Sequence, residues 1–177
     1  YFNKENFKEI LPLALVYPLL FFGFQTFGLK DVDSSLGGII LSMAPIFTLI
    51  LARVFLKEKP SKGQVAFVLL AVSGVIFIFY NIMRGSDRSN SNIVGILLLL
   101  ITTICFSSYS IMARSYTAKY ENLELLTVMI SIGFIAFNIL ALAMNIKNNS
   151  FSTYISPLKE GKYLLAMVYL GVLSTLG

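Results

Sequence analysis

Long apolar runs separated by short polar connections dominate this chain. A membrane-spanning α-helix needs about 20 consecutive apolar residues, and the pattern predicts six such helices, the last of them cut off by the end of the sequence. The connections are short, so consecutive helices are expected to be antiparallel neighbours. The predicted helices cover residues 10–29, 34–56, 64–83, 92–113, 123–146 and 163–177. The pattern therefore predicts an all-α fold, a polytopic membrane helix bundle.

Composition supports the membrane assignment. Hydrophobic residues make up 56% of the chain and charged residues 13%, and the mean hydropathy is +0.79. Soluble domains have roughly 45–50% apolar and about 25% charged residues. The net charge is +5, but the basic residues lie in short pieces between apolar runs, so no nucleic acid is expected as a partner. The expected partners are the lipid bilayer and a small-molecule substrate, and a homodimer is left open.

The residue types needed for catalysis are scarce. The chain has no histidine and a single cysteine, Cys105, which excludes imidazole acid–base catalysis and a Cys/His metal site. A transferase embedded in the membrane would need clustered His, Asp or Glu at the membrane face, and no such cluster is evident. We therefore expect no catalytic residues, no metal and no cofactor.

A proline lies near the middle of the second predicted helix. Pro45 removes a backbone donor and leaves a carbonyl near Leu41 without its usual partner, so the helix is expected to bend there. Ser42, three residues earlier, is placed to bond the freed backbone or to face a cavity. The alternative for Pro45 is a kink that serves packing alone.

Lysine and arginine concentrate between the second and third predicted helices, at Arg53, Lys57, Lys59 and Lys62. Cytoplasmic loops of membrane proteins carry an excess of these residues, so the 57–63 loop and residues 1–9 are expected to be cytoplasmic, in a bacterial plasma membrane. Ser61 and Gln64 have the spacing of a capping box that would begin the third helix.

Other polar residues lie at membrane positions. Gln25 and Thr26 are near the end of the first helix, and Ser107, Ser108 and Tyr109 are expected to form a polar patch in the fourth. Together with Pro45 and Ser42 they are the candidate substrate-pathway residues, although interhelical hydrogen bonds are the alternative for the polar ones. No charge lies deep in the helices, which favours neutral, zwitterionic or amphipathic substrates. Close helix approach is expected at Gly23, Gly37 and Gly38.

A faint repeat links the first and last predicted helices. "LALVY" at 13–17 and "LAMVY" at 165–169 match at four of five positions. The second copy lies in the fifth helix after the first. Because consecutive helices cross the membrane in opposite directions, these two helices would run in opposite directions. Equivalence of the two copies would make them inverted repeats, an architecture common among secondary transporters.

The stretch from Ser34 to Ile78 combines small residues at the start of a helix, a mid-helix proline, a charged turn and a glycine in the next helix. These residues are Ser34, Ser35, Ser42, Pro45, the Lys57-Glu58-Lys59 turn and Gly74. In this pattern the stretch resembles the EamA domain of the drug/metabolite transporter superfamily. Residues 95–116 also resemble the helix that opens the second half of such proteins. The resemblance implies ten helices in two inverted five-helix repeats, of which this chain would supply helices three to eight. Residues 1–83 would close the first repeat, 84–91 would form an outer linker, and 92–177 would open the second.

The resemblance also implies a function. Such a protein would be a secondary transporter that moves small metabolites or drug-like solutes by alternating access, without covalent chemistry and not as an enzyme. The alternatives are a non-transporting bundle, acting as a receptor or scaffold, and a membrane-embedded transferase.

Overall fold

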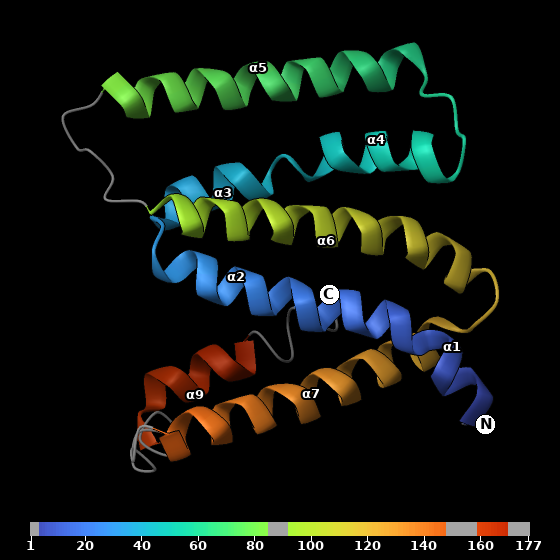
Figure 1. The fold of residues 1–177 in the computed structure, drawn as a ribbon, viewed down its shortest axis with the longest axis vertical. Helices are drawn as coiled ribbons and strands as arrows, with labels where there is room; N and C mark the ends of the chain where they lie inside the picture. Colours follow the sequence, from blue (N-terminus) through green and yellow to red (C-terminus); the bar gives the residue numbers. More distant parts are fainter. Residues whose placement is uncertain (1–3, 85–91, 148–158, 170–177) are drawn as a thin grey trace. The chain divides into compact units, whose positions relative to one another are not determined.

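The computed structural model describes residues 4–84, 92–147 and 159–169, and every regular element within them is helical (Figure 1). Four stretches are long and apolar enough to cross a membrane: Phe7–Lys30, Ser34–Phe55, Ile93–Thr117 and Asn122–Ile146. The prediction of an all-α polytopic bundle is confirmed. In chain order the elements are α1 (Lys4–Ala14), the π-helical turn η1 (Leu15–Leu20), α2 (Phe21–Lys30), α3 (Ser34–Leu41), α4 (Ala44–Phe55), α5 (Lys62–Arg84), α6 (Ile93–Thr117), α7 (Asn122–Lys147) and α9 (Gly161–Val168).

The chain divides into two compact units, residues 1–133 and 134–177. The second holds the end of α7 and the short helix α9, which begins two residues before the last predicted helix and overlaps its start. The rest of that prediction, residues 170–177, lies outside the described residues. In the predicted linker 84–91, Arg84 belongs to α5, and residues 85–91 lie outside the described part.

Helix α6 is the centre of the first unit. It contacts α1, η1 and α2 on one side and α3 and α4 on the other, while α5 lies beside α4 (Figure 1). Two buried clusters hold these helices together. One joins Ile10, Leu13 and Ala14 of α1 to Leu125, Val128 and Met129 of α7. The other joins Leu99 of α6 to Val32, Leu36 and Ile40.

Two glycines allow α2 and α6 to approach closely. A Cβ atom added to Gly95 of α6 would lie 2.6 Å from Val32 Cγ2 and 3.0 Å from the carbonyl oxygen of Gly28. A Cβ added to Gly28 would lie 2.8 Å from Leu99 Cγ. Both positions therefore require glycine. Of the glycines expected at close approaches, Gly37 is tightly packed, whereas Gly23 and Gly38 have open space around the Cβ position.

The first span differs from the continuous helix predicted over 10–29. Tyr17 has φ −140° and ψ 119°, an extended conformation inside the π-helical turn. The next residue is Pro18, and the residue before a proline is disfavoured in the helical region because its backbone clashes with the proline ring. Pro18 is buried, and a Cβ added to Gly133 of α7 would lie 2.7 Å from Pro18 Cγ. The first span is thus broken near its middle.

The second span is broken as well. The break lies at Ser42 and Met43, just before Pro45. Helix α3 ends at Leu41, and a tight turn follows in which the Met43 N–H donates to the carbonyl of Ile40 at 3.1 Å. Pro45 then occupies the first turn of α4. Proline is well tolerated there because the first turn of a helix has no internal partner for its N–H groups. In place of the expected bend in one helix, the structure has the end of α3 and the start of a new helix, α4.

A reciprocal capping box begins α5. The Ser61 N–H donates to Gln64 Oε1 at 2.8 Å, and the Gln64 N–H donates to Ser61 Oγ at 3.2 Å. This is the arrangement expected from the Ser61/Gln64 spacing.

Candidate functional site

A cavity of about 410 Å³ lies between α4, α5 and α6. Its volume is in the range of small-molecule sites, roughly 300–1,000 Å³. Four groups of residues line it: Ala44, Pro45, Thr48, Leu49, Ala52 and Arg53 from α4; Glu58, Lys59 and Pro60 from the α4–α5 connection; Gln64, Phe67 and Val68 from α5; and Phe106 and Arg114 from α6.

The cavity runs from the middle of the second span to one of its ends. Pro45 follows the break, and Arg53 lies in the last turn of α4. These positions are eight residues apart, about 12 Å along an α-helix. The charged lining residues all lie toward the end where α4 stops and α5 begins, and the deeper lining of α4 is mostly apolar. The cavity therefore has an apolar interior and a charged mouth.

An ion pair spans the mouth. Arg114 Nη1 of α6 lies 3.3 Å from Glu58 Oε2 of the α4–α5 connection, and their side chains are 58% and 54% exposed. Exposed ion pairs contribute little to stability; the distance shows that the α4–α5 connection lies beside α6 at this point. Lys57, the residue before Glu58, has φ 54°, a left-handed conformation that turns the chain at the end of α4.

The break in the second span receives hydrogen bonds from α6. Thr103 Oγ1 donates to the carbonyl of Ile40 at 3.3 Å, and Ser107 Oγ donates to that of Ala44 at 3.0 Å. Both hydroxyls are fully buried. The two donors are one helical turn apart on α6, and the two acceptors flank the break at the same spacing. Helix α6 thus supplies polar partners where a membrane interior has no water to do so.

Ser107→Ala is expected to lower the free energy of unfolding by about 1 kcal/mol, the usual net contribution of a hydrogen bond. Ser108→Ala is the matched control, since among the described residues the Ser108 hydroxyl donates within its own helix alone, to the Ile104 carbonyl at 2.8 Å. Thermal unfolding of the purified variants in one detergent measures both. Equal loss of stability in the two variants would contradict a role for Ser107 at the break.

Aromatic residues gather at the break in the first span. Tyr17 stacks on Tyr109 of α6 with ring centroids 4.5 Å apart. Phe106 lies one turn before Tyr109, and its ring centroid is 6.3 Å from that of Tyr17 and 5.7 Å from that of Phe21. Because Phe106 also lines the cavity, one side chain joins the first break to the cavity wall.

The predicted patch at Ser107, Ser108 and Tyr109 is not a single surface. Ser107 faces the carbonyl of Ala44, Ser108 bonds within α6, and Tyr109 stacks on Tyr17. Successive residues of a helix point in different directions because 3.6 residues complete one turn. The structure therefore sends the three side chains to different neighbours.

The other candidates divide between cavity and helix surface. Pro45 lines the cavity. Ser42 Oγ donates to the Ile39 carbonyl at 2.6 Å, and Thr26 Oγ1 donates to that of Phe22 at 2.7 Å. Gln25 is half-buried in α2. Among the residues assigned to topology and capping, Arg53, Lys59 and Gln64 also line the cavity, which sequence reasoning did not anticipate.

The local sequence around several residues that line the cavity does not indicate that they do so. Arg114 and Glu58 are 56 positions apart, and nothing in the sequence indicates that they pair. Phe67 and Phe106 are ordinary members of apolar runs, and only the packing of α5 and α6 assigns them to one cavity.

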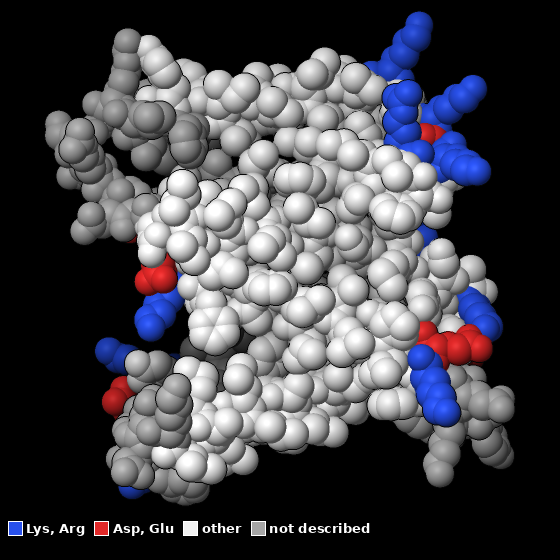
Figure 2. Space-filling view, viewed as in Figure 1, with Lys and Arg blue, Asp and Glu red and all other residues white. Residues whose placement is uncertain are grey.

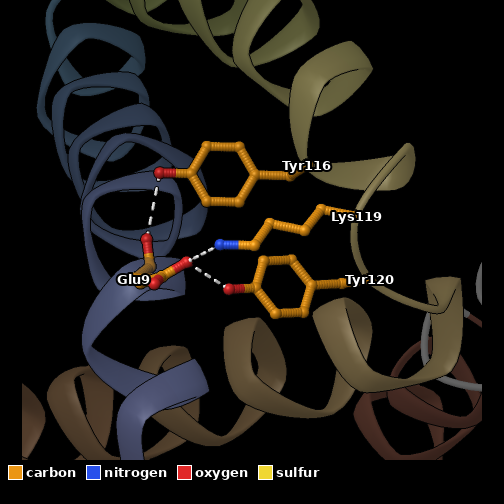
Figure 3. A network of polar contacts seen from close by, with 4 residues as sticks. All are labelled: Glu9, Tyr116, Lys119 and Tyr120. Carbon is orange, nitrogen blue, oxygen red and sulfur yellow. Dashed lines mark hydrogen bonds and ion pairs between the residues drawn. The ribbon is translucent and has the colours of Figure 1, made fainter.

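A second polar network joins Glu9 of α1 to residues at and just after the end of α6 (Figure 3). The Glu9 carboxylate accepts hydrogen bonds from Lys119 Nζ and the Tyr120 hydroxyl, and the Tyr116 hydroxyl donates to the Glu9 main-chain carbonyl at 3.0 Å. The bond to Glu9 raises the pKa of Lys119 above its usual value. The network ties α1 to the turn between α6 and α7.

Basic side chains gather where α4 ends and α5 begins (Figure 2). The described residues that form this basic end are Arg53, Lys57, Lys59 and Lys62, with Arg114 of α6 joined to them through Glu58. The opposite end of the unit carries Lys30 together with Asp31 and Asp33. Among the residues whose side chains the structure describes in this unit, the α4–α5 end therefore carries the denser group of Lys and Arg.

Comparison with known proteins gives a consistent result. Residues 2–80 match the model of the EamA-like transporter family. The uncharacterized transporter YcxC of Bacillus subtilis (strain 168) is 44% identical over 168 residues, which are 95% of this chain and 53% of that protein. An uncharacterized transporter of Archaeoglobus fulgidus is 30% identical over 121 residues, 68% of this chain and 41% of that protein.

A mammalian protein shares a shorter stretch. Solute carrier family 35 member G1 of Mus musculus is 42% identical over 72 residues, 40% of this chain and 18% of that protein. No solved structure matches. The chain spans about half the length of the YcxC transporter and less of the other two. With four helices of spanning length and this set of relatives, the chain is an integral membrane protein, and its residues 2–80 are similar to the EamA-like transporter family.

Proposed function

We propose that the protein containing this chain is a secondary transporter that moves small metabolites or drug-like solutes by alternating access, with the cavity as part of the solute pathway. The observation that carries the proposal is the cavity's course from a helix break at mid-span to one end of the bundle. Transporter binding sites are typically built near the bilayer midplane by discontinuous helices. The mostly apolar interior suits neutral, zwitterionic or amphipathic solutes.

The proposal includes an inverted repeat, with residues 1–83 closing the first half and 92–177 opening the second. The matching segments at 13–17 and 165–169 support it. They differ locally, since Tyr17 is extended before Pro18 whereas Tyr169 is helical, with φ −57° and ψ −51°. The complete sequence tests the repeat: a continuation without a proline-containing spanning helix and one further helix would contradict it.

The proposed orientation places the basic end in the cytoplasm of a bacterial cell. The asymmetry of lysine and arginine between the two ends supports it. In a Cys105→Ala background, a cysteine replacing Lys57 should react with a membrane-impermeant maleimide only in inverted vesicles. A cysteine replacing Asp33 should react in intact cells. The reverse pattern would overturn the orientation.

Transport is tested with the complete protein in proteoliposomes, by measuring uptake across a broad panel of metabolites. Saturable flux is expected for at least one solute class. Absence of saturable flux from folded, membrane-inserted protein across the panel would overturn the proposal.

Pro45→Ala should lower the flux per folded molecule by about tenfold, equivalent to about 1.4 kcal/mol, because α3 and α4 can then join into one helix and reshape the cavity wall. Pro12→Ala is the matched control, since Pro12 lies inside α1 and does not line the cavity. Equal flux from both variants would assign Pro45 to packing alone.

A further inference from the structure

The charges at the mouth of the cavity are unbalanced. Arg53, Lys59 and Arg114 line it from three different elements, and Glu58 is the carboxylate among the lining residues. Glu58 is paired with Arg114. Within the described part of the chain, neither Arg53 nor Lys59 has a carboxylate at ion-pair distance. The mouth therefore presents two cationic groups that a ligand can approach.

Behind the mouth the walls are mostly apolar, with the hydroxyl-bearing Thr48 of α4 among the lining residues. Leu49 and Ala52 of α4 lie between Arg53 and the break, Phe67 and Val68 face the cavity from α5, and Phe106 does so from α6. The cationic group of Arg53 and the break at Pro45 are separated by about 12 Å of helix. A ligand that contacts both would have a charged head and an apolar body roughly as long as that distance.

We propose that the solute is a small organic anion with an apolar body, whose anionic group is bound at the mouth by Arg53 and Lys59 and whose body lies between Phe67 and Phe106. This inference rests on the proposed function and names the chemical class of its solute. Arginine presents several N–H donors in a planar fork that fits a carboxylate, and the apolar walls favour a hydrophobic body.

The same basic residues also have a topological role, because positive charge marks cytoplasmic loops. The positions of the basic residues distinguish anion binding from the topological role. Lys57 and Lys62 belong to the same basic end but do not line the cavity. A topological effect depends on the number of charges near the membrane, whereas anion binding depends on the charges that line the cavity. Neutralising either pair removes the same charge, and only one pair is expected to affect binding.

The test uses three probes with one apolar body and different heads: 4-phenylbutyrate, 4-phenylbutan-1-ol and 4-phenylbutylamine. Binding to the complete protein in phosphatidylcholine nanodiscs is measured at pH 7, where a carboxylic acid is ionised. The butyrate should bind saturably and at least about tenfold more tightly than the alcohol and the amine, about 1.4 kcal/mol. Equal binding of the three probes would overturn the inference.

The matched variants are Arg53→Gln/Lys59→Gln and Lys57→Gln/Lys62→Gln. The first pair should weaken butyrate binding by about tenfold or more, and the second pair should leave it unchanged. Equal weakening by both pairs would overturn the inference, since it would indicate attraction to overall charge. Complete loss of butyrate binding in nanodiscs rich in phosphatidylglycerol would overturn it too, because it would assign the site to an anionic lipid.

Binding and transport are read separately. Saturable butyrate binding with no flux of any solute would support an organic-anion site in the cavity and overturn the proposed function. Saturable flux of neutral or cationic solutes, with no preference for the butyrate, would overturn this inference and leave the proposed function in place.

Discussion

Replacing Gly95 with valine is expected to cause a large loss of folded protein. Even a Cβ atom at this position would lie 2.6 Å from Val32 Cγ2 and 3.0 Å from the backbone oxygen of Gly28. Val32 is itself buried in the cluster around Leu99, so it has little room to move. The larger side chain would push α2 away from α6. Overpacking typically costs about 1–3 kcal/mol, and more where the backbone must shift.

The matched control is Gly38→Val, at a helical glycine with nothing within 4 Å of the Cβ position. Its intrinsic effect on the helix is expected to be within about 1 kcal/mol. The monodisperse fraction after size-exclusion chromatography and the midpoint of thermal unfolding measure both variants. Similar stability of the two would show that the α2–α6 contact does not require glycine at position 95.

Filling the cavity is expected to stop transport while the protein stays folded. Thr48 lies one turn after Pro45 and lines the cavity between the break and the mouth. Thr48→Trp would place a bulky indole in a space of about 410 Å³. Saturable flux should fall by at least about tenfold, which corresponds to about 1.4 kcal/mol, because the solute and the indole compete for one volume.

Ile50→Trp is the matched control for this variant. Ile50 lies on the same helix, but it is 52% exposed and does not line the cavity, so its replacement should face lipid. Flux is measured in proteoliposomes and normalised to the amount of folded protein. Equal flux from the Thr48 and Ile50 variants would mean that the solute does not pass through this cavity.

The sequence predicted the helices well, because membrane helices are specified by length and apolarity alone. The start of α5 was also predictable, since a capping box depends on residues three positions apart. The break at Tyr17 had a usable signal in Pro18, because the residue before a proline avoids the helical region. That signal was hidden by the uniform apolarity of residues 10–29.

The contacts between helices could not be predicted from the sequence. Gly28 and Gly95 resemble every other glycine in an apolar run, and only the rotation of α2 and α6 about their axes brings the two together. The hydroxyl groups of Thr103 and Ser107 bond carbonyls 63 positions away. The cavity likewise combines residues from three helices and a connection. These features depend on how helices pack, which a single sequence does not specify.

The hydroxyls of Thr103 and Ser107 have a further property that bears on movement. Each also lies within hydrogen-bond distance of a carbonyl in its own helix: Leu99 O at 2.8 Å for Thr103 and Thr103 O at 2.9 Å for Ser107. If the second span moved away from α6, each donor would keep an acceptor, so no hydroxyl would be stranded in a dry environment. The contact between α6 and the second span can therefore separate and form again without leaving either hydroxyl donor unpaired.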